Sequence, residues 1–216
     1  MSTKTLHLLF CGLLLSAVTA CDNRNIHQVV KEIAEAPVDT AGMEENILQV
    51  NVFSEIDIDC FADVTFHQCN SFFIKIKARP EVLPHVSVKN TDGVLRLSTD
   101  RRYRMPEKAV ITIDISAPSL NKATLNGIKC LRLGNIRQSS PLHLDINGVG
   151  AITASSVTVP EISCNLVGAG SIDLKGIDTQ RLTAELTGSG NIYLQGRCDK
   201  QIFKQTGTGT ISFDKQ

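Results

Sequence analysis

The stretch Leu186-Thr187-Gly188-Ser189-Gly190-Asn191-Ile192 decides the fold, because near copies of it recur through the C-terminal half of the chain. The first glycines of these copies stand 21, 20, 20 and 19 residues apart and are Gly127, Gly148, Gly168, Gly188 and Gly207. Self-similarity at a fixed period of this length is typical of solenoids, in which each repeat is one structural unit. The segment 121–216 is therefore predicted to be a series of stacked repeats.

Each repeat places apolar residues in the same columns. Four positions after the first glycine, the residues are Leu131, Ile152, Ile172, Ile192 and Ile211. Each repeat is then two short strands with a Gly-x-Gly turn between them, followed by a second corner near Ile136, Val157 and Ile177. Gln201 and Gln205 occupy two inward columns of the last repeat, which suits a terminal coil that meets solvent.

A single coil cannot be stable alone. It buries about five aliphatic side chains, which contribute on the order of 10 kcal/mol gross, and ordering ~20 residues costs more than that. Coils must therefore stack, ~4.8 Å apart, as neighbouring parallel strands. Because parallel connections are nearly always right-handed, we predict an all-β fold: a right-handed parallel β-helix (β-solenoid) with ~20-residue coils.

The N-terminal half of the domain also has a strand pattern. Runs that alternate apolar and polar residues, such as Ile56-Asp57-Ile58, indicate half-buried strands. Asn90-Thr91-Asp92-Gly93 is a turn sequence between two such runs. No segment after residue 46 has a convincing helical pattern. The β-helix domain is predicted to span 47–216, with the Gly-x-Gly coil repeats in 121–216.

The N-terminus has the features of a secretory signal. Lys4 precedes an apolar run over 6–18 that is too short to span a bilayer, and the run ends in Val18-Thr19-Ala20-Cys21. These four residues resemble the lipobox of bacterial lipoproteins, in which cleavage precedes the cysteine and its thiol is acylated. We expect a lipoprotein signal peptide at 1–20, lipidation of Cys21 and a lipidated tether at 21–46. The alternative is a short buried helix followed by an ordinary cysteine.

Composition excludes one class of partner. Lys plus Arg and Asp plus Glu number 22 each, so the formal net charge is zero, and aromatic residues make up only 5% of the 216 residues. A nucleic-acid-binding protein needs a basic surface, and many also use aromatic stacking platforms. We therefore expect no nucleic-acid partner. The membrane is the expected partner through the lipid anchor.

The lipobox, the alternating strands and the tandem glycine turns together resemble the head GIN domain family, over roughly residues 50–216. Leu186 to Ile192 is the clearest motif, whereas Gly127-Ile128-Lys129 departs from the pattern because it lacks the second glycine. The family is described as "putative auto-transporter adhesin" and otherwise has no known function. The resemblance implies a β-helix on an envelope lipoprotein and carries over no functional residues.

One charge-dense loop is the candidate ligand site. The segment Asp100 to Lys108 contains Arg101, Arg102, Tyr103 and Arg104, side chains suited to an anionic glycan or a lipid headgroup. The alternative is a solvated loop closed by acidic neighbours. Two outward columns of small or polar residues are a second expected surface, flat and rich in hydrogen-bonding groups; they contain Ala151, Ser171, Asn191 and Thr210, and Asn126, Asn147, Thr187 and Thr206.

Catalysis has one weak candidate pair. Asp145 and Glu185 fall in one outward column two coils apart, a backbone separation of ~9.6 Å that is near the upper spacing for an inverting glycosidase. Nothing in the sequence marks either residue as buried or perturbed, and a solvated strand face is the favoured interpretation, so no catalytic residue is predicted. The Gly-x-Gly turns resemble anion cradles only superficially, because tight corners that need positive φ account for them.

Neither a metal nor a cofactor is predicted, since the sequence has no Cys-x-x-Cys and no His-x-x-x-His. Cys164 aligns with apolar residues and is expected to be buried. Cys60 and Cys69 are the one pair considered for a disulfide.

These observations favour an envelope-anchored lipoprotein whose β-helix is a binding or structural module of adhesin type. The expected location is the bacterial cell envelope, at the outer membrane or the cell surface, and the expected ligand is a glycan or another envelope component. Two alternatives stay open: a polysaccharide-processing enzyme on a β-helix scaffold, and a structural envelope protein that self-associates as a homo-oligomer.

Overall fold

The structure is a computed structural model that describes residues 42–106, 109–127 and 130–216. The predicted signal peptide, Cys21 and the tether up to residue 41 lie outside these described residues. Within the described part, seventeen strands belong to one continuous hydrogen-bonded sheet, and the short turn η1 (Leu83–His85) is the helical element. None of the described helical structure is long and apolar enough to span a membrane.

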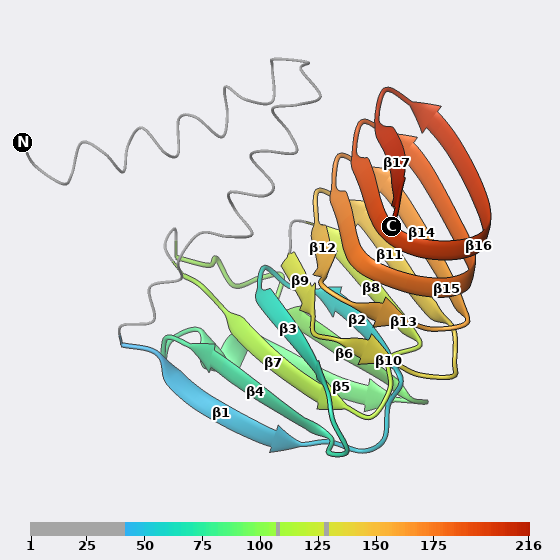
Figure 1. Cartoon of the computed structure of the whole chain (residues 1–216). Coiled ribbons are helices and arrows are strands. Elements are labelled where there is room, and N and C mark those ends of the chain that lie inside the picture. The colour runs from blue at the N-terminus through green and yellow to red at the C-terminus, as the bar shows by residue number, and fades with distance from the viewer. Residues whose placement is uncertain (1–41, 107–108, 128–129) are drawn as a thin grey trace, which may run out of the picture.

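The C-terminal half is a stack of parallel coils with strands on three faces (Figure 1). The first face consists of β8 (Lys122–Gly127), β11 (Leu142–Gly148), β14 (Glu161–Gly168) and the last parts of β15 (Ser171–Gly188) and β16 (Asn191–Gly207). The second face consists of β9 (Cys130–Leu133), β12 (Ala151–Ala154), the first parts of β15 and β16, and β17 (Thr210–Lys215). The third consists of β10 (Ile136–Arg137), β13 (Val157–Thr158) and the middle parts of β15 and β16.

Every pairing within this stack is parallel, and the register is the one that the glycine alignment predicts. Ile172 pairs with Ile152 on one side and with Ile192 on the other, and its side chain is completely buried. The predicted parallel β-solenoid and its inward columns are therefore confirmed.

The sequence predicted a second corner near Ile136, Val157 and Ile177, and the structure has a short third face at that place. Six residues, 155–160, connect β12 to β14, and this is enough chain for a bend, the two extended residues of β13 and a second bend. The register also shifts here between β15 and β16, where Ile177 pairs with Gly196. The last full coil is thus one residue shorter than the coil before it.

Glycine is required at the corner between the first and second faces. Gly168 has a φ of +131°, and a Cβ added to it would collide with the carbonyl oxygen of Gly148 in the coil below. An L side chain therefore meets two costs at this position, a disfavoured backbone conformation and a clash with a neighbouring backbone. The close approach of successive corners explains why the glycines recur at the coil period.

The N-terminal half closes one end of the stack. β2 (Glu55–Asp59) and β3 (Asp63–Gln68) lie parallel to β8 and β9 and extend the first two faces by one layer. β6 (Val94–Thr99) and β7 (Thr112–Ala117) pair in parallel with β2 and β3.

Antiparallel pairs complete this end. β4 (Phe73–Ala78) lies between β7 and β1 (Glu44–Gln49), and β5 (Val86–Thr91) pairs with β6. The β5–β6 turn contains Asp92 and Gly93, both with positive φ, as predicted from the sequence. The N-terminal half is thus a mixed sheet and not a set of ~20-residue coils, and β1 includes residues 44–46 of the predicted tether.

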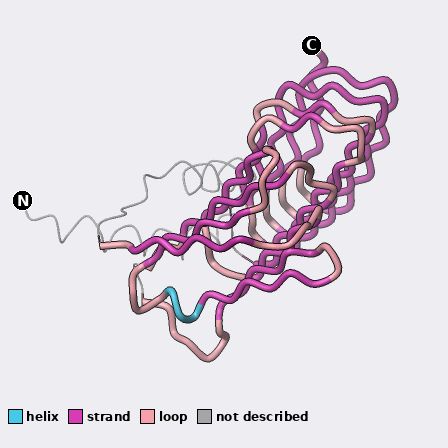
Figure 2. Tube along the Cα trace, turned by 90° about the horizontal axis from the view of Figure 1, so that it is seen from below, coloured by secondary structure: helices cyan, strands magenta, loops and turns pink. Residues whose placement is uncertain are grey.

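A continuous apolar core runs from this mixed sheet through the stacked coils. Figure 2 shows the successive layers of the backbone that enclose it. The core ends before the last coil is complete. Gln201, Phe203 and Gln205 stand in register with Leu182, Ala184 and Leu186 of the coil below, yet all three are exposed. The C-terminal end of the solenoid therefore meets solvent, as the two glutamines predicted.

Candidate functional site

The charged loop that the sequence analysis identified as a candidate ligand site follows β6 and is folded against η1. The amide N–H of Asp100 donates to His85 O (3.0 Å), and its carboxylate accepts from the amide N–H of Arg102 (2.9 Å). The ring of Tyr103 stacks on the imidazole of His85 with centroids 3.6 Å apart and planes within 9°. Tyr103 thus positions the loop and is not an open stacking surface.

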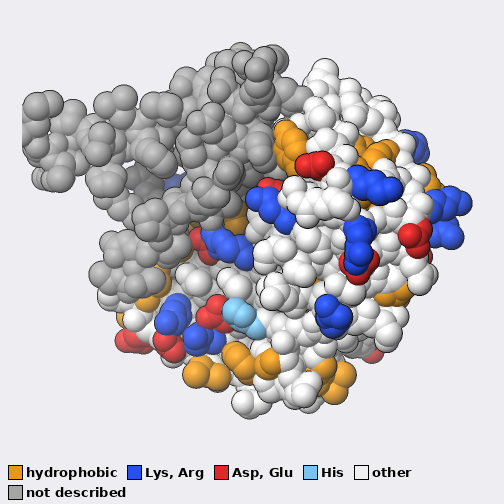
Figure 3. Space-filling model, in the orientation of Figure 1, with side chains coloured by type: hydrophobic (Ala, Val, Ile, Leu, Met, Phe, Trp, Pro, Cys, Tyr) orange, Lys and Arg blue, Asp and Glu red, His pale blue; other side chains and the backbone are white. Residues whose placement is uncertain are grey.

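The arginines of this loop do not form one cluster of unpaired charge. Arg101 Nη2 donates to Asp59 Oδ2 (3.0 Å) at the end of β2, as the solvated-loop alternative anticipated, whereas Arg102 and Arg104 are exposed. Figure 3 shows basic and acidic side chains interspersed over one face of the molecule. The loop retains two accessible guanidinium groups, but Tyr103 and Arg101 are engaged within the protein.

Of the two outward columns, one is exposed and one is buried. Asn147 Nδ2 donates to Oδ1 of the half-buried Asn126 (3.1 Å), and Thr187 and Thr206 continue this column as exposed residues. The exposed apolar side chain of Val167 stands between Asn147 and Thr187 in the same column. The other column was expected to be open and is not: Ala151, Ser171 and Asn191 are 3%, 5% and 2% exposed. After these three corners two consecutive residues are buried, so the alternation of the strand begins one residue later than predicted, whereas Thr210 in the last coil is exposed as expected.

The two carboxylates considered for catalysis occupy the column that the alignment gave them. Asp145 pairs with Asn165, which pairs with Glu185, so one coil separates the two acids. Asp145 Oδ2 lies 3.1 Å from Lys122 Nζ, and Glu185 is exposed. This arrangement is an outer strand face with one ion pair between coils.

The considered disulfide is wrong: in the described part of the chain, Cys60 and Cys69 are not joined. The six residues of β3 separate them, and an extended strand of that length spans about 20 Å, far beyond the reach of a disulfide. Cys69 is exposed with its Sγ 2.7 Å from Ser116 Oγ. Cys164 is completely buried, as predicted, and burial raises the pKa of its thiol to about 12.

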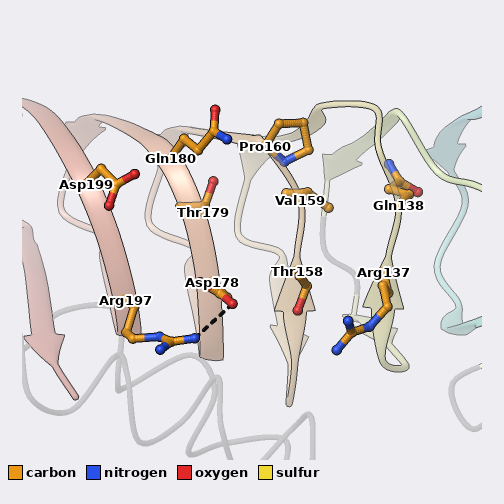
Figure 4. A pocket seen from close by; sticks show the side chains of 10 residues that line it. All are labelled: Arg137, Gln138, Thr158, Val159, Pro160, Asp178, Thr179, Gln180, Arg197 and Asp199. Atoms are coloured by element: carbon orange, nitrogen blue, oxygen red, sulfur yellow. Dashed lines mark hydrogen bonds and ion pairs between the residues drawn. The ribbon is translucent and has the colours of Figure 1, made fainter.

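A groove on the third face was not predicted from the sequence (Figure 4). It has a volume of about 530 Å³ and crosses four successive strands of the stack: β10, β13, and the middle parts of β15 and β16. The lining residues are Arg137, Gln138, Thr158, Val159, Pro160, Asp178, Thr179, Gln180, Arg197 and Asp199.

Side-chain length explains why the surface is hollow here. Arg137, Thr158, Asp178 and Arg197 are in register and form one column across the four strands. The column has long side chains at both ends and short ones in the middle. Val159 and Pro160 add two further short side chains between the glutamines of the neighbouring coils. The groove is therefore a trough with an arginine at each end.

The wall at the β10 end is held by hydrogen bonds from two glutamines. Gln68 Nε2 donates to Arg137 O (3.0 Å), and Arg137 N donates to Gln68 Oε1 (2.8 Å), which fixes the backbone of β10. Gln138 binds both backbone polar groups of Leu120 through its side-chain amide (2.8 and 3.0 Å). These contacts cap the unpaired edge of β10 and hold the groove in shape.

The groups that face the open space are less engaged. Arg197 Nη2 donates to Asp178 Oδ2 (3.0 Å), and these two side chains are 71% and 50% exposed. Within the described residues, the guanidinium group of Arg137 has no ion pair or hydrogen bond, and only the backbone of this residue is bonded. None of the loop residues Arg101 to Arg104 lines the groove.

Two further predictions concern the lipidation of Cys21 and the binding of a metal ion. Cys21 lies outside the described residues, so its lipidation stays a prediction. Among the described residues, there is no group of three or more His, Cys, Asp or Glu side chains placed to hold a metal ion.

Comparison with solved structures gives several similar folds. One is a "putative adhesin" from Bacteroides fragilis, with a TM-score of 0.53 and 17% identity, covering 80% of this chain and 97% of that chain. Others are a "putative adhesin" from Parabacteroides distasonis (TM-score 0.47, 15% identity, 82% and 99% covered) and a "putative cell adhesion protein" from Clostridium sporogenes (0.48, 12%, 81% and 100%). No curated protein matches the chain.

At this level of identity, the likeness to the Bacteroides fragilis protein concerns the fold alone. The sequence itself matches a family model over residues 52–215, which is nearly the whole of the β domain. The chain therefore belongs to the family described as "Putative auto-transporter adhesin, head GIN domain".

Proposed function

We propose that the protein is a lipid-anchored binding protein of adhesin type in the bacterial cell envelope, whose solenoid binds an extended glycan. The observation that carries this proposal is the outer surface of the stacked coils, where Asn147 donates to the half-buried Asn126 (3.1 Å) and, beyond Val167, Thr187 and Thr206 continue the same column. Outward columns repeat every ~4.8 Å along the stack. A polymer with a regular repeat can make the same contact in successive coils, and several copies on one membrane add avidity.

The carboxylates of the enzyme alternative lack the surroundings that catalysis requires. A general acid needs a pocket that alters its protonation, and an inverting pair needs a sugar held between the two groups. Asp145 is paired with Lys122, and Glu185 stands on an exposed strand. Binding by many weak, repeated contacts suits such a face better than bond cleavage does.

The binding role is tested with the full-length, detergent-solubilised protein against a panel of envelope and host polysaccharides, with binding and cleavage measured in parallel. We expect binding without cleavage, and binding that survives Asp145→Ala and Glu185→Ala. Detectable cleavage that vanishes in either variant would falsify the binding role and establish the enzyme.

The charged loop is tested separately. Replacing Arg101, Arg102 and Arg104 together with glutamine weakens binding if the loop contributes to the glycan site. Lys89→Gln, which removes an exposed positive charge from β5, is the control. Unchanged binding in the triple variant would exclude the loop and leave the strand faces as the site.

The anchor is tested by Cys21→Ser. Each buried methylene of an acyl chain contributes about 0.8 kcal/mol, so two or three chains hold a protein firmly to a membrane. We expect the wild type to incorporate a labelled fatty acid and to sediment with membranes, and the variant to do neither. Equal labelling of both proteins would contradict lipidation at this residue.

Self-association is a second candidate function, and the open end of the solenoid favours it. Ile202 and Phe203 in the last coil are 43% and 39% exposed. Among the described strands, β17 pairs only with β16, so one of its edges carries unpaired backbone groups. Exposed edges with apolar side chains are common sites of strand pairing between molecules.

A further inference from the structure

The groove on the third face presents both donors and acceptors to a ligand. Arg137 offers a guanidinium group that no described residue engages. The Asp178–Arg197 pair uses one carboxylate oxygen and one guanidinium nitrogen, so other atoms of both groups remain available beside each other. Thr158 adds a half-buried hydroxyl group between Arg137 and Asp178.

These groups match the chemistry of a sugar. Adjacent hydroxyl groups both donate and accept hydrogen bonds, and an aspartate beside an arginine satisfies both needs. A planar guanidinium binds a carboxylate through two parallel hydrogen bonds, and such bonds are about twice as strong as neutral ones. The half-buried ring of Pro160 adds a small apolar surface that suits the C–H face of a sugar ring.

The groove is also built before a ligand arrives. Gln68 and Gln138 hold the backbone around Arg137, and Thr179 is buried with its hydroxyl bonded to Arg181 O (3.2 Å). A site with a fixed frame loses less entropy on binding than a mobile loop does.

The spacing of the two arginines determines the direction in which a ligand lies in the groove. Arg137 and Arg197 stand three coil steps apart in one column, or about 14 Å between backbones. An extended oligosaccharide along the stack axis therefore crosses the trough from one arginine to the other. Its successive residues meet Arg137, Thr158 and the Asp178–Arg197 pair in turn.

From these contacts we infer that the groove binds an acidic saccharide, with a carboxylate on Arg137 and hydroxyl groups on Thr158, Asp178 and Arg197. The inference rests on the glycan-binding role proposed above and adds to it a site and a ligand class. It differs from the loop hypothesis, which places the anion on Arg101 to Arg104.

The test is calorimetric titration of the full-length, detergent-solubilised protein with an oligogalacturonate and with its carboxyl-reduced, neutral counterpart. We expect the wild type to bind the acidic oligomer at least about tenfold more tightly, because one charge-assisted bidentate contact has that effect. Arg137→Gln should abolish the preference, and Lys89→Gln should leave it unchanged. Asp178→Asn should weaken binding of the neutral oligomer, whose hydroxyl groups lose a charged acceptor. Equal thermal midpoints establish that the variants are folded.

Four results would overturn the inference. Equal affinity of the wild type for the two oligomers, or an unchanged preference in Arg137→Gln, excludes the arginine site and leaves the glycan-binding role intact. Stronger binding to anionic than to neutral phospholipid vesicles that is lost in Arg137→Gln, with no binding of either saccharide, assigns the groove to a headgroup instead. Failure of every polysaccharide in the wider panel overturns the binding role and the inference together.

Discussion

At the scale of single residues, the corner after every Gly-x-Gly turn except the last buries two consecutive side chains, such as Ser171 and Ile172. Only Ile172 belongs to the apolar core, where it stacks on Ile152 and Ile192. The position of a residue relative to the corner therefore matters more than simple alternation. Asp173, the next residue, is the first whose side chain lies at the surface.

Ile172→Asp should destabilise the protein by several kcal/mol or prevent folding, because it leaves an unpaired carboxylate in the core. Asp173→Thr should have little effect, since Thr153 already occupies the same column in the coil below. Thermal unfolding followed by circular dichroism measures both. Similar midpoints for the two variants would contradict the register.

The thiols should differ sharply in reactivity. Hydrogen bonds with Ser116 and Ser71 lower the pKa of the exposed Cys69 thiol, whereas burial and the charge of Asp145 raise that of Cys164. Since the thiolate is the reactive form, Cys69 should be alkylated rapidly near neutral pH. Cys164 should react only after unfolding. Peptide mapping by mass spectrometry distinguishes the sites, and labelling of Cys164 in native protein at a comparable rate would refute this ordering.

At the scale of elements, one edge of β10 is not paired with another strand, and a side chain binds its backbone there instead. Gln68, at the end of β3, binds the backbone N–H and C=O of Arg137 and also donates to Pro118 O (2.8 Å). One glutamine thus joins the mixed N-terminal sheet to the third face of the solenoid. The groove begins at this junction.

Gln68→Ala should lower the free energy of unfolding by about 1–3 kcal/mol, because it leaves backbone groups without partners. Gln195→Ala is the matched control: its one side-chain hydrogen bond, to Asp214, is long at 3.4 Å. The control should change stability by less than about 0.5 kcal/mol. Urea unfolding compares the two, and equal losses would show that Gln68 does not cap β10.

At the scale of the whole molecule, the two ends of the solenoid are unequal. The mixed sheet covers one end, and the last coil leaves Ile202 and Phe203 exposed at the other. The stack therefore has a preferred direction for any contact between copies.

If this end self-associates, elution volume in gel filtration should depend on protein concentration, and Ile202→Lys with Phe203→Lys should remove that dependence. The double variant should unfold at nearly the wild-type temperature, because both side chains are already exposed. Val149→Lys, another exposed apolar position at a corner between faces, is the control. Monomeric behaviour of the wild type at all concentrations would exclude the homo-oligomer.

The sequence by itself determined the solenoid, its coil length and its inward columns. Those features follow from one local rule, a corner glycine and an aliphatic residue four positions later, and stacking forces equal positions into register. The same rule could not reveal that the column of Ser171 and Asn191 is buried, since burial at a corner depends on the neighbouring coils.

Only the tertiary structure decided the groove. The coil that contains Arg197 is one residue shorter, and a constant offset from the glycines would place Cys198, not Arg197, beside Asp178. The glycine alignment places Arg137, Thr158 and Asp178 in one column, but it predicts a corner there and not the two-residue strands that make this column a third face. A trough forms where long side chains of some coils stand next to short side chains of others. The shape of this surface therefore depends on the order of the coils in the stack and not on any one repeat.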